Sequence, residues 1–104
     1  MGNTNNMMRQ AQALQKKLME AQAELAEAEV TGSAGGGMVT VRVTGAGELR
    51  DVTIARDVVD PDDVEMLQDM VLAAVNEGLR AAKALESDRL GGLAGGLGLP
   101  PGLL

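Results

Sequence analysis

The stretch MMRQAQALQKKLMEAQAELAEAE, residues 7–29, decides the fold. Its apolar and small residues recur at alternating spacings of four and three, at Met7, Ala11, Leu14, Leu18, Ala21, Leu25 and Ala28. This heptad pattern predicts one long helix that lies against a partner helix. With a cap among Thr4, Asn5 and Asn6 and an end near Glu29, the helix would be about 35 Å long.

The chain of 104 residues contains no His, Cys, Phe, Tyr or Trp. His and Cys supply many general bases and nucleophiles, and aromatic rings form the platforms on which single-stranded bases stack. Ser33 and Ser87 therefore have no His to activate them, and the acidic residues lack the spacing of a calcium-binding loop. We predict no enzyme activity, no cofactor, no metal site and no disulfide.

The folded part of the chain is expected to be small. About 85 residues remain once the Asn-rich start and the Gly/Pro/Leu-rich end are set aside. Buried Val, Leu and Met side chains each stabilise by roughly 1.5–3 kcal/mol at best, so a homodimer that shares its apolar surface is predicted. The sequence has no apolar run of membrane-spanning length and no signal-peptide pattern, so a cytoplasmic protein without membrane contact is expected.

The net charge of −6 is unevenly divided along the chain. Residues 1–19 carry +3 with no acidic residue, residues 20–79 carry −10, and residues 80–104 carry +1. Exposed charges act over about 8 Å at physiological salt. A basic end can therefore bind a polyanion that the acidic middle repels.

The middle of the chain reads as a small antiparallel β-meander. Residues 30–34 turn extended, and residues 38–44 alternate with period two, which places Val39, Val41 and Val43 on one face of a strand. Residues 48–55 read as a further strand with Val52 and Ile54 facing inward. The glycines at 35–37 could be a phosphate-binding loop, but such loops lead into a helix, and here a strand follows, so a turn is favoured.

A second long helix is predicted after residue 60. Asp60 is the expected cap and Pro61 the first helical residue. The inner face is formed by Val64, Leu67, Val71, Ala74, Gly78, Ala81 and Leu85. The helix should end near Gly91, which divides the chain into an α+β domain at 1–90 and a flexible Gly/Pro/Leu-rich tail at 91–104.

The methionines could form an adaptable binding surface, but in a core without aromatic rings they are favoured as core filler. They are Met7, Met8, Met19, Met38, Met66 and Met70.

In this order of elements the sequence resembles the YbaB/EbfC family of bacterial nucleoid-associated proteins. The resemblance is carried by Met8–Gln12, Gly35–Val39, Gly45 with Glu48, Asp60–Asp63 and Gly95–Gly102. It implies a homodimer whose sheet joins two subunits and whose long helices project like the arms of tweezers. It further implies a cytoplasmic, nucleoid-associated protein that binds double-stranded DNA with low or variable sequence preference, without a cofactor, and with a link to recombination and repair proteins.

The candidate DNA-binding residues are basic and lie on the two predicted helices. They are Arg9, Lys16, Lys17, Arg80, Lys83 and Arg89, of which Arg89 falls on a different face from Arg80. If the helices pack antiparallel, these groups should meet at one end and contact phosphates. The alternative is an ordinary solvated face. Arg42, Arg50 and Arg56 lie among acids and should form surface pairs.

Two functions therefore remain open. The first is a dimeric protein that binds and organises duplex DNA. The second is a protein-interaction module linked to DNA recombination or repair, in which the helices or the tail grip another protein, and which has no strong DNA binding of its own.

Overall fold

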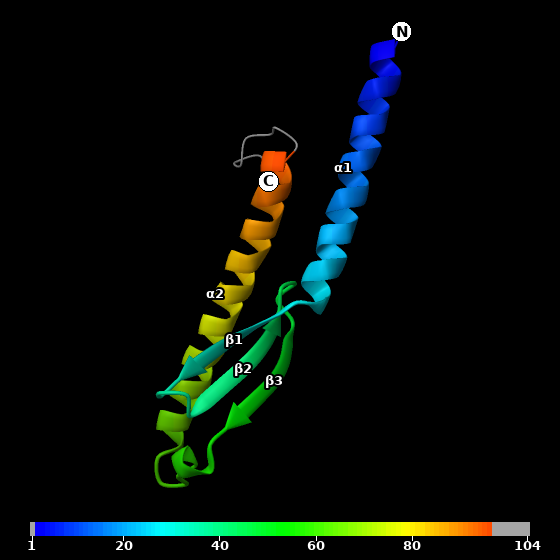
Figure 1. The fold of residues 1–104 in the computed structure, drawn as a ribbon. Helices are drawn as coiled ribbons and strands as arrows, with labels where there is room; N and C mark the ends of the chain where they lie inside the picture. Colours follow the sequence, from blue (N-terminus) through cyan, green and yellow to red (C-terminus); the bar gives the residue numbers. More distant parts are fainter. Residues whose placement is uncertain (1, 97–104) are drawn as a thin grey trace.

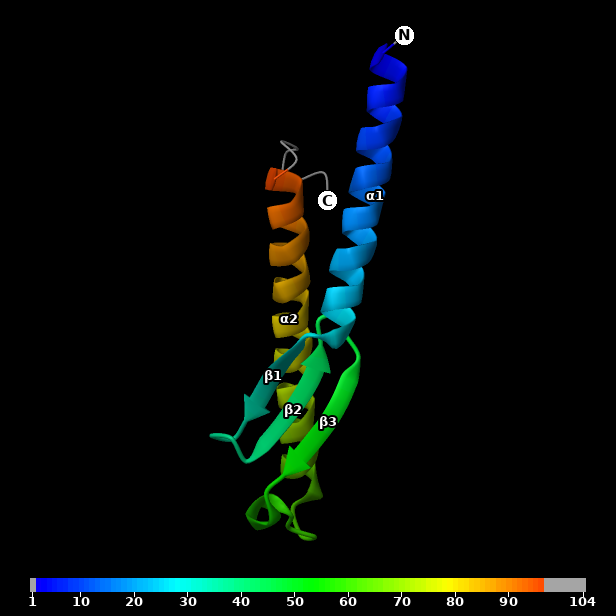
Figure 2. The same ribbon diagram turned by 45° about the vertical axis from the view of Figure 1, so that its right-hand side comes forward.

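The computed structural model describes residues 2–96 as two long helices that flank a three-stranded sheet (Figure 1). The elements are α1 (Gly2–Glu27), β1 (Glu29–Ala34), β2 (Val39–Thr44), β3 (Leu49–Ile54), the short 3-10 helix η1 (Arg56–Val58) and α2 (Val64–Gly96). The molecule is elongated, measuring 74 × 21 × 16 Å. Both views show α2 running behind the sheet and then extending, beside α1, past one end of it (Figures 1 and 2). The predicted α+β class is confirmed.

The sheet is an antiparallel meander in the order β1-β2-β3, as the sequence predicted. Gly32 pairs with Val41, Val41 pairs with Val52, and a bulge interrupts the β2–β3 ladder at Arg42/Val43. The three glycines at 35–37 join β1 to β2 with φ values of 63°, 67° and 92°. Only glycine adopts such a left-handed backbone freely, so the favoured interpretation as a turn is confirmed.

The core lies between α2 and the first two strands. Val39, Val41 and Val43 are fully buried, with Ala74 and Ala82 of α2 against them. The helix approaches the sheet closely at two glycines: a Cβ built on Gly32 would lie 2.3 Å from the Ala74 carbonyl oxygen and 2.3 Å from the Gly78 nitrogen. Small residues at this crossing therefore set the distance between the helix and the sheet.

The prediction that Val52 and Ile54 face inward is wrong as a statement about burial. The register places them on the same face as the β2 valines, because paired residues share a face. However, α2 packs over β1 and β2, and Val52 and Ile54 remain 39% and 38% exposed. A single helix about 10 Å wide covers about two strands spaced 4.8 Å apart, so β3 extends past its cover.

The second helix begins three residues later than predicted. Asp63 is its cap, since its Oδ1 accepts a hydrogen bond from the Met66 amide at 3.2 Å. Asp60 instead accepts from the Asp62 amide at 2.9 Å within the preceding turn. Val64 was expected on the inner face but is 51% exposed, because α2 has only just started there and lies beyond the sheet.

The end of the second helix also differs from the prediction. α2 runs through Gly91 and Gly92 to Gly96, so the predicted stop near Gly91 is wrong. Glycine disfavours a helix by only about 1 kcal/mol, and Leu90 and Leu93 are half-buried on this turn. The rest of the predicted tail, residues 97–104, lies outside the described residues, and its flexibility stays a prediction.

The interpretation of the methionines as core filler is wrong for most of them. Met7, Met8 and Met19 are 69%, 58% and 63% exposed, whereas Met70 is half-buried against the core. The core is formed instead mainly by the valines of β2 and the alanines of α2.

Candidate nucleic-acid interface

The two helices run antiparallel, and an ion pair between them marks their relative position. Arg89 of α2 donates from Nη1 to Glu24 Oε2 of α1 at 2.8 Å. At 1.5 Å per residue, the end of α2 then lies level with about Lys17. The first fifteen residues of α1, numbers 2–16, therefore project about 22 Å past the end of α2. This projecting half is visible in both ribbon views (Figures 1 and 2).

The heptad seam is divided between two environments. Leu25 is buried at 3% exposure, and a Cβ on Gly45 would meet its side chain at 2.8 Å, so the lower seam packs on the β2–β3 turn. The Gly45 amide also donates to the Ala28 carbonyl at 2.9 Å. Higher up, Leu14, Leu18 and Ala21 are half-buried, and Met7 and Ala11 are exposed. The lower half of the seam therefore has its partner within the same chain.

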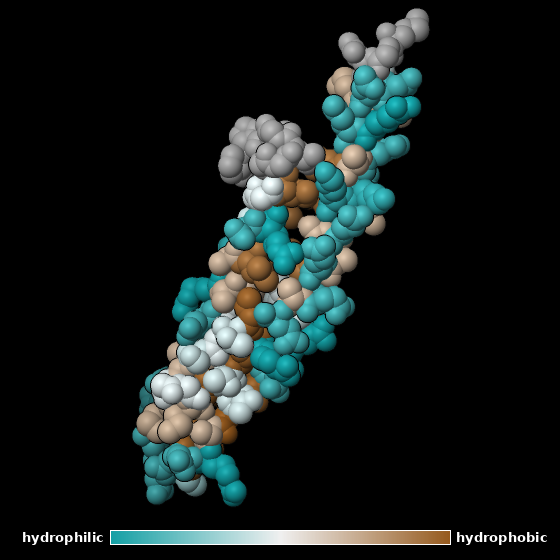
Figure 3. Space-filling view, in the orientation of Figure 1, coloured by the Kyte–Doolittle hydropathy of each residue, from teal (hydrophilic) through white to brown (hydrophobic). Residues whose placement is uncertain are grey.

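Apolar surface runs between the two helices, while the outer surface of α1 is mostly hydrophilic (Figure 3). This division follows from the helical period: at 100° per residue, Arg9 and Lys16 lie about 180° from Leu25. Lys17 lies on a flank. All three basic side chains are exposed, and residues 2–19 contain no acid.

The structure does not bring the basic residues of the two helices together. Arg9 lies fifteen residues above Glu24, or about 22 Å, and Arg80 lies nine residues on the other side of Arg89, or about 14 Å. The two guanidinium-bearing residues are thus about 36 Å apart along the molecule. The prediction that these basic residues meet at one end of the molecule is wrong within a single chain. Arg9 lies on the part of α1 that projects past the end of α2, whereas Arg80 lies far from that end of α2. Arg80 and Lys83 are exposed beside the sheet instead.

The basic residues also differ in whether they form ion pairs. Arg89 was predicted to contact DNA but is bound to Glu24, a carboxylate 65 positions away that no local pattern could reveal. Arg42 pairs with Glu29 at 3.3 Å and with Asp51 at 3.7 Å, which confirms the predicted surface pairs for this residue. Within residues 2–96, Arg50 and Arg56 form no ion pair.

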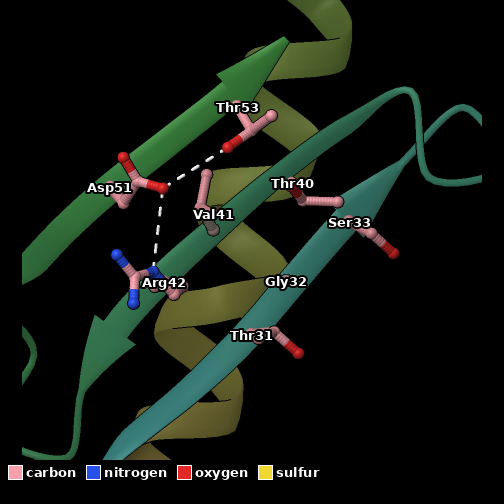
Figure 4. A pocket seen from close by; sticks show the side chains of 8 residues that line it. All are labelled: Thr31, Gly32, Ser33, Thr40, Val41, Arg42, Asp51 and Thr53. Atoms are coloured by element: carbon pink, nitrogen blue, oxygen red, sulfur yellow. Dashed lines mark hydrogen bonds and ion pairs between the residues drawn. The ribbon is translucent and has the colours of Figure 1, made fainter. Parts of the chain in front are cut away.

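The face of the sheet away from α2 is polar and contains a pocket (Figure 4). Its lining includes Thr31, Ser33, Thr40, Arg42, Asp51 and Thr53. Arg42 is the one cation among the lining residues, and its carboxylate partners Glu29 and Asp51 neutralise it; the dashed line from Arg42 to Asp51 marks one of these pairs. The pocket therefore offers hydroxyls without net positive charge and is a poor site for phosphate.

The described residues 2–96 hold neither a cluster of metal ligands nor a membrane-spanning helix. No three His, Cys, Asp or Glu side chains converge there to hold a metal ion. No helix in this part of the chain has the length and apolar character needed to cross a membrane. The exposed basic residues on the helices remain the leading candidate site.

Similarity to known proteins shows the family of the chain. The model of the YbaB/EbfC DNA-binding family matches residues 1–97. The chain belongs to this family. A nucleoid-associated protein of Acetivibrio thermocellus is 52% identical over 98% of this chain and 90% of its own length. Another, of Exiguobacterium sp., is 56% identical over 96% of this chain and 95% of its own length.

A solved structure supports the fold as well. The crystal structure of an uncharacterized protein from Helicobacter pylori matches with a TM-score of 0.67 and 27% identity, covering 75% of this chain and 82% of the other. The family resemblance predicted from the sequence is confirmed. YbaB/EbfC membership places the chain among DNA-binding proteins rather than enzymes.

Proposed function

We propose that this protein is a nucleoid-associated homodimer that binds duplex DNA with low or variable sequence specificity. The observation that carries the proposal is the projecting half of α1, which is acid-free and exposes Arg9, Lys16 and Lys17. Arg80 and Lys83 add cations lower on α2. Contacts from these side chains to phosphates would supply most of the affinity, because the DNA backbone has the same charge at every sequence.

The acidic balance of the whole chain is compatible with this role because residues 2–19 contain no acid and a large group of carboxylates lies far from them. The acid-rich segment around η1, which includes Asp57, Asp60 and Asp62, lies at the opposite end of a molecule 74 Å long (Figure 1). The screening length at physiological salt is about 8 Å. A duplex at the tip of α1 therefore interacts with the basic residues far more strongly than with these carboxylates.

An exposed apolar ledge supports the dimer. Ile54, Val52 and Leu49 of β3 point to the face that α2 occupies but lie beyond the helix, and each is 38–43% exposed. Leu79 of α2 lines a hollow together with the β2–β3 turn. The side of α2 that carries Leu79 is therefore the side next to β3. Leu72, seven residues before Leu79 on that side, is 61% exposed. Apolar surface of this kind is usually covered by a partner, and β3 is also an edge strand with unpaired backbone groups.

Dimerisation would double the number of basic arms that can hold one duplex. Two linked sites raise the effective affinity without any new contact, provided that both reach the DNA together. Such a protein would organise DNA in the bacterial nucleoid, in the cytoplasm, and would affect gene expression or repair through that organisation. The names of the relatives as nucleoid-associated proteins support this location.

Charge reversal tests the proposal. Lys16→Glu should weaken binding to duplexes of unrelated sequence by similar factors, because it removes a phosphate contact and adds repulsion. Arg56→Glu is the matched control, since Arg56 is exposed near the acidic end, and binding should change little. Fluorescence anisotropy with labelled duplexes measures both. Loss of binding in Arg56→Glu with unchanged binding in Lys16→Glu would overturn the assignment of the surface.

A second function is favoured by the apolar ledge itself. If a different protein, rather than a second copy, covers Leu72 and Ile54, the chain is an interaction module linked to recombination or repair. A wild-type protein that binds no duplex even at low salt would support this function over the first.

A further inference from the structure

The outer face of the projecting half of α1 carries a regular series of polar side chains. Asn5, Arg9, Gln12 and Lys16 are spaced by four, three and four residues, and all four are exposed. At 100° per residue they lie within an arc of about 60°, on the side of the helix opposite Leu18 and Leu25. Amides and cations therefore alternate along one face.

This alternation matches the chemistry of the major groove of DNA. The side-chain amide of Gln or Asn forms two hydrogen bonds with the N6 and N7 atoms of adenine. Arg and Lys donate to guanine or to phosphates. The first acidic residue on this side of α1 is Glu20, which follows the series and would repel phosphates if it lay within it. The face can hold DNA and also distinguish bases.

The geometry allows entry into the groove. The major groove is about 12 Å wide and accepts a single helix. Residues 2–16 of α1 project past the end of α2 with no other helix or strand of the described residues beside them (Figures 1 and 2). Asn5 and Lys16 are about 17 Å apart along the helix, or about five base pairs. A partner helix on the seam would cover the opposite side and leave this face free.

We propose that Gln12, supported by Asn5, is a specificity-determining residue that reads adenine in the major groove, while Arg9 and Lys16 fix the helix in place. The inference rests on the proposed DNA binding. The sequence preference that the inference predicts would come from one face of one helix. Phosphate contacts by Lys17, on a flank, would add affinity without preference.

The test compares Gln12→Ala with Gln10→Ala in the full-length protein. Gln10 is also exposed but lies about 120° away from the proposed reading face. A preferred duplex is first selected from a randomised pool with the wild-type protein, and each adenine of the selected site is then exchanged in turn. Alanine favours the helix in both variants, so circular dichroism should show both folded.

Gln12→Ala should reduce the discrimination between the selected duplex and one exchanged duplex by about 5- to 150-fold. Its salt dependence should stay that of the wild type, whereas Lys16→Ala should lower the salt slope by about 1 and keep the discrimination. Gln10→Ala should change neither quantity.

Two results would overturn the inference. Selection that yields no preferred duplex, although the protein binds DNA, would refute base reading and leave the proposed function intact. Full discrimination in Gln12→Ala would refute the role of Gln12. Absence of any DNA binding would refute the proposed function itself, so the two failures are distinguishable.

Discussion

The substitution Gly32→Ala should strongly destabilise the protein. The added Cβ would lie 2.3 Å from the Ala74 oxygen, 2.3 Å from the Gly78 nitrogen and 2.7 Å from the Gly78 Cα. All three are backbone atoms of α2, so no side-chain rotation relieves the overlap, and the helix must move away from Val41. Overpacking of this kind destabilises by up to about 3 kcal/mol, and Ala at the same time stabilises by up to about 1 kcal/mol through the unfolded chain.

The net loss should therefore be about 2 kcal/mol, or about 8–16 °C in Tm for a domain of this size. Thermal unfolding followed by circular dichroism measures it, at one fixed protein concentration because a dimer's Tm depends on concentration. Gly92→Ala is the matched control, since Gly92 is helical and nothing lies within 4 Å of its added Cβ. A Tm for Gly32→Ala within 2 °C of wild type would refute the close helix–sheet contact.

The remaining predictions concern the helix ends, the seam and the ledge. Gly92→Ala should raise the Tm, because Ala favours a helix over Gly by up to about 1 kcal/mol. A lower Tm would show that the added methyl group meets a neighbour. Asp63→Ala should cost about 1 kcal/mol through the lost cap on the Met66 amide, while Asp63→Asn should retain stability in urea unfolding. Leu18→Asp should dissociate or unfold the protein, because it places a charge in the half-buried seam; a wild-type Tm and mass would contradict this. Leu72→Lys should convert the dimer to a folded monomer in light scattering, whereas Met8→Lys, also at an exposed apolar residue, should not; an unchanged mass in Leu72→Lys would exclude the ledge.

Local patterns in the sequence predicted the parts of the fold that depend on neighbouring residues. The period-two alternation of Val39, Val41 and Val43 placed the buried strand correctly, because every second side chain of a strand shares a face. The glycines at 35–37 marked the turn. The heptad pattern predicted α1, since it depends only on the helical period.

The features that the sequence did not predict depend on contacts between distant segments. The exposure of Ile54 follows from how many strands one helix can cover, and that is a property of the assembled layers. The pairing of Arg89 with Glu24 depends on where α2 lies against α1. Asp60 and Asp63 are chemically equivalent as caps, so only the path of the chain decides between them.

The separation of the basic residues along the arms has the same origin. Arg9 and Arg80 both lie on long helices, and the sequence patterns predicted these helices. The apolar repeat of each helix does not specify the offset between the two helices along their axes. The Arg89–Glu24 pair marks that offset and shows that α1 projects beyond α2.

The central claim is that the basic arms bind DNA through its phosphates, and the dependence of affinity on salt tests it most directly. The affinity of the wild-type protein for one labelled duplex should be measured by fluorescence anisotropy over a series of salt concentrations. If about four to six phosphates are neutralised per dimer, log affinity should fall against log salt with a slope of roughly −4 to −5. A slope near zero, or no binding at the lowest salt, would contradict the account.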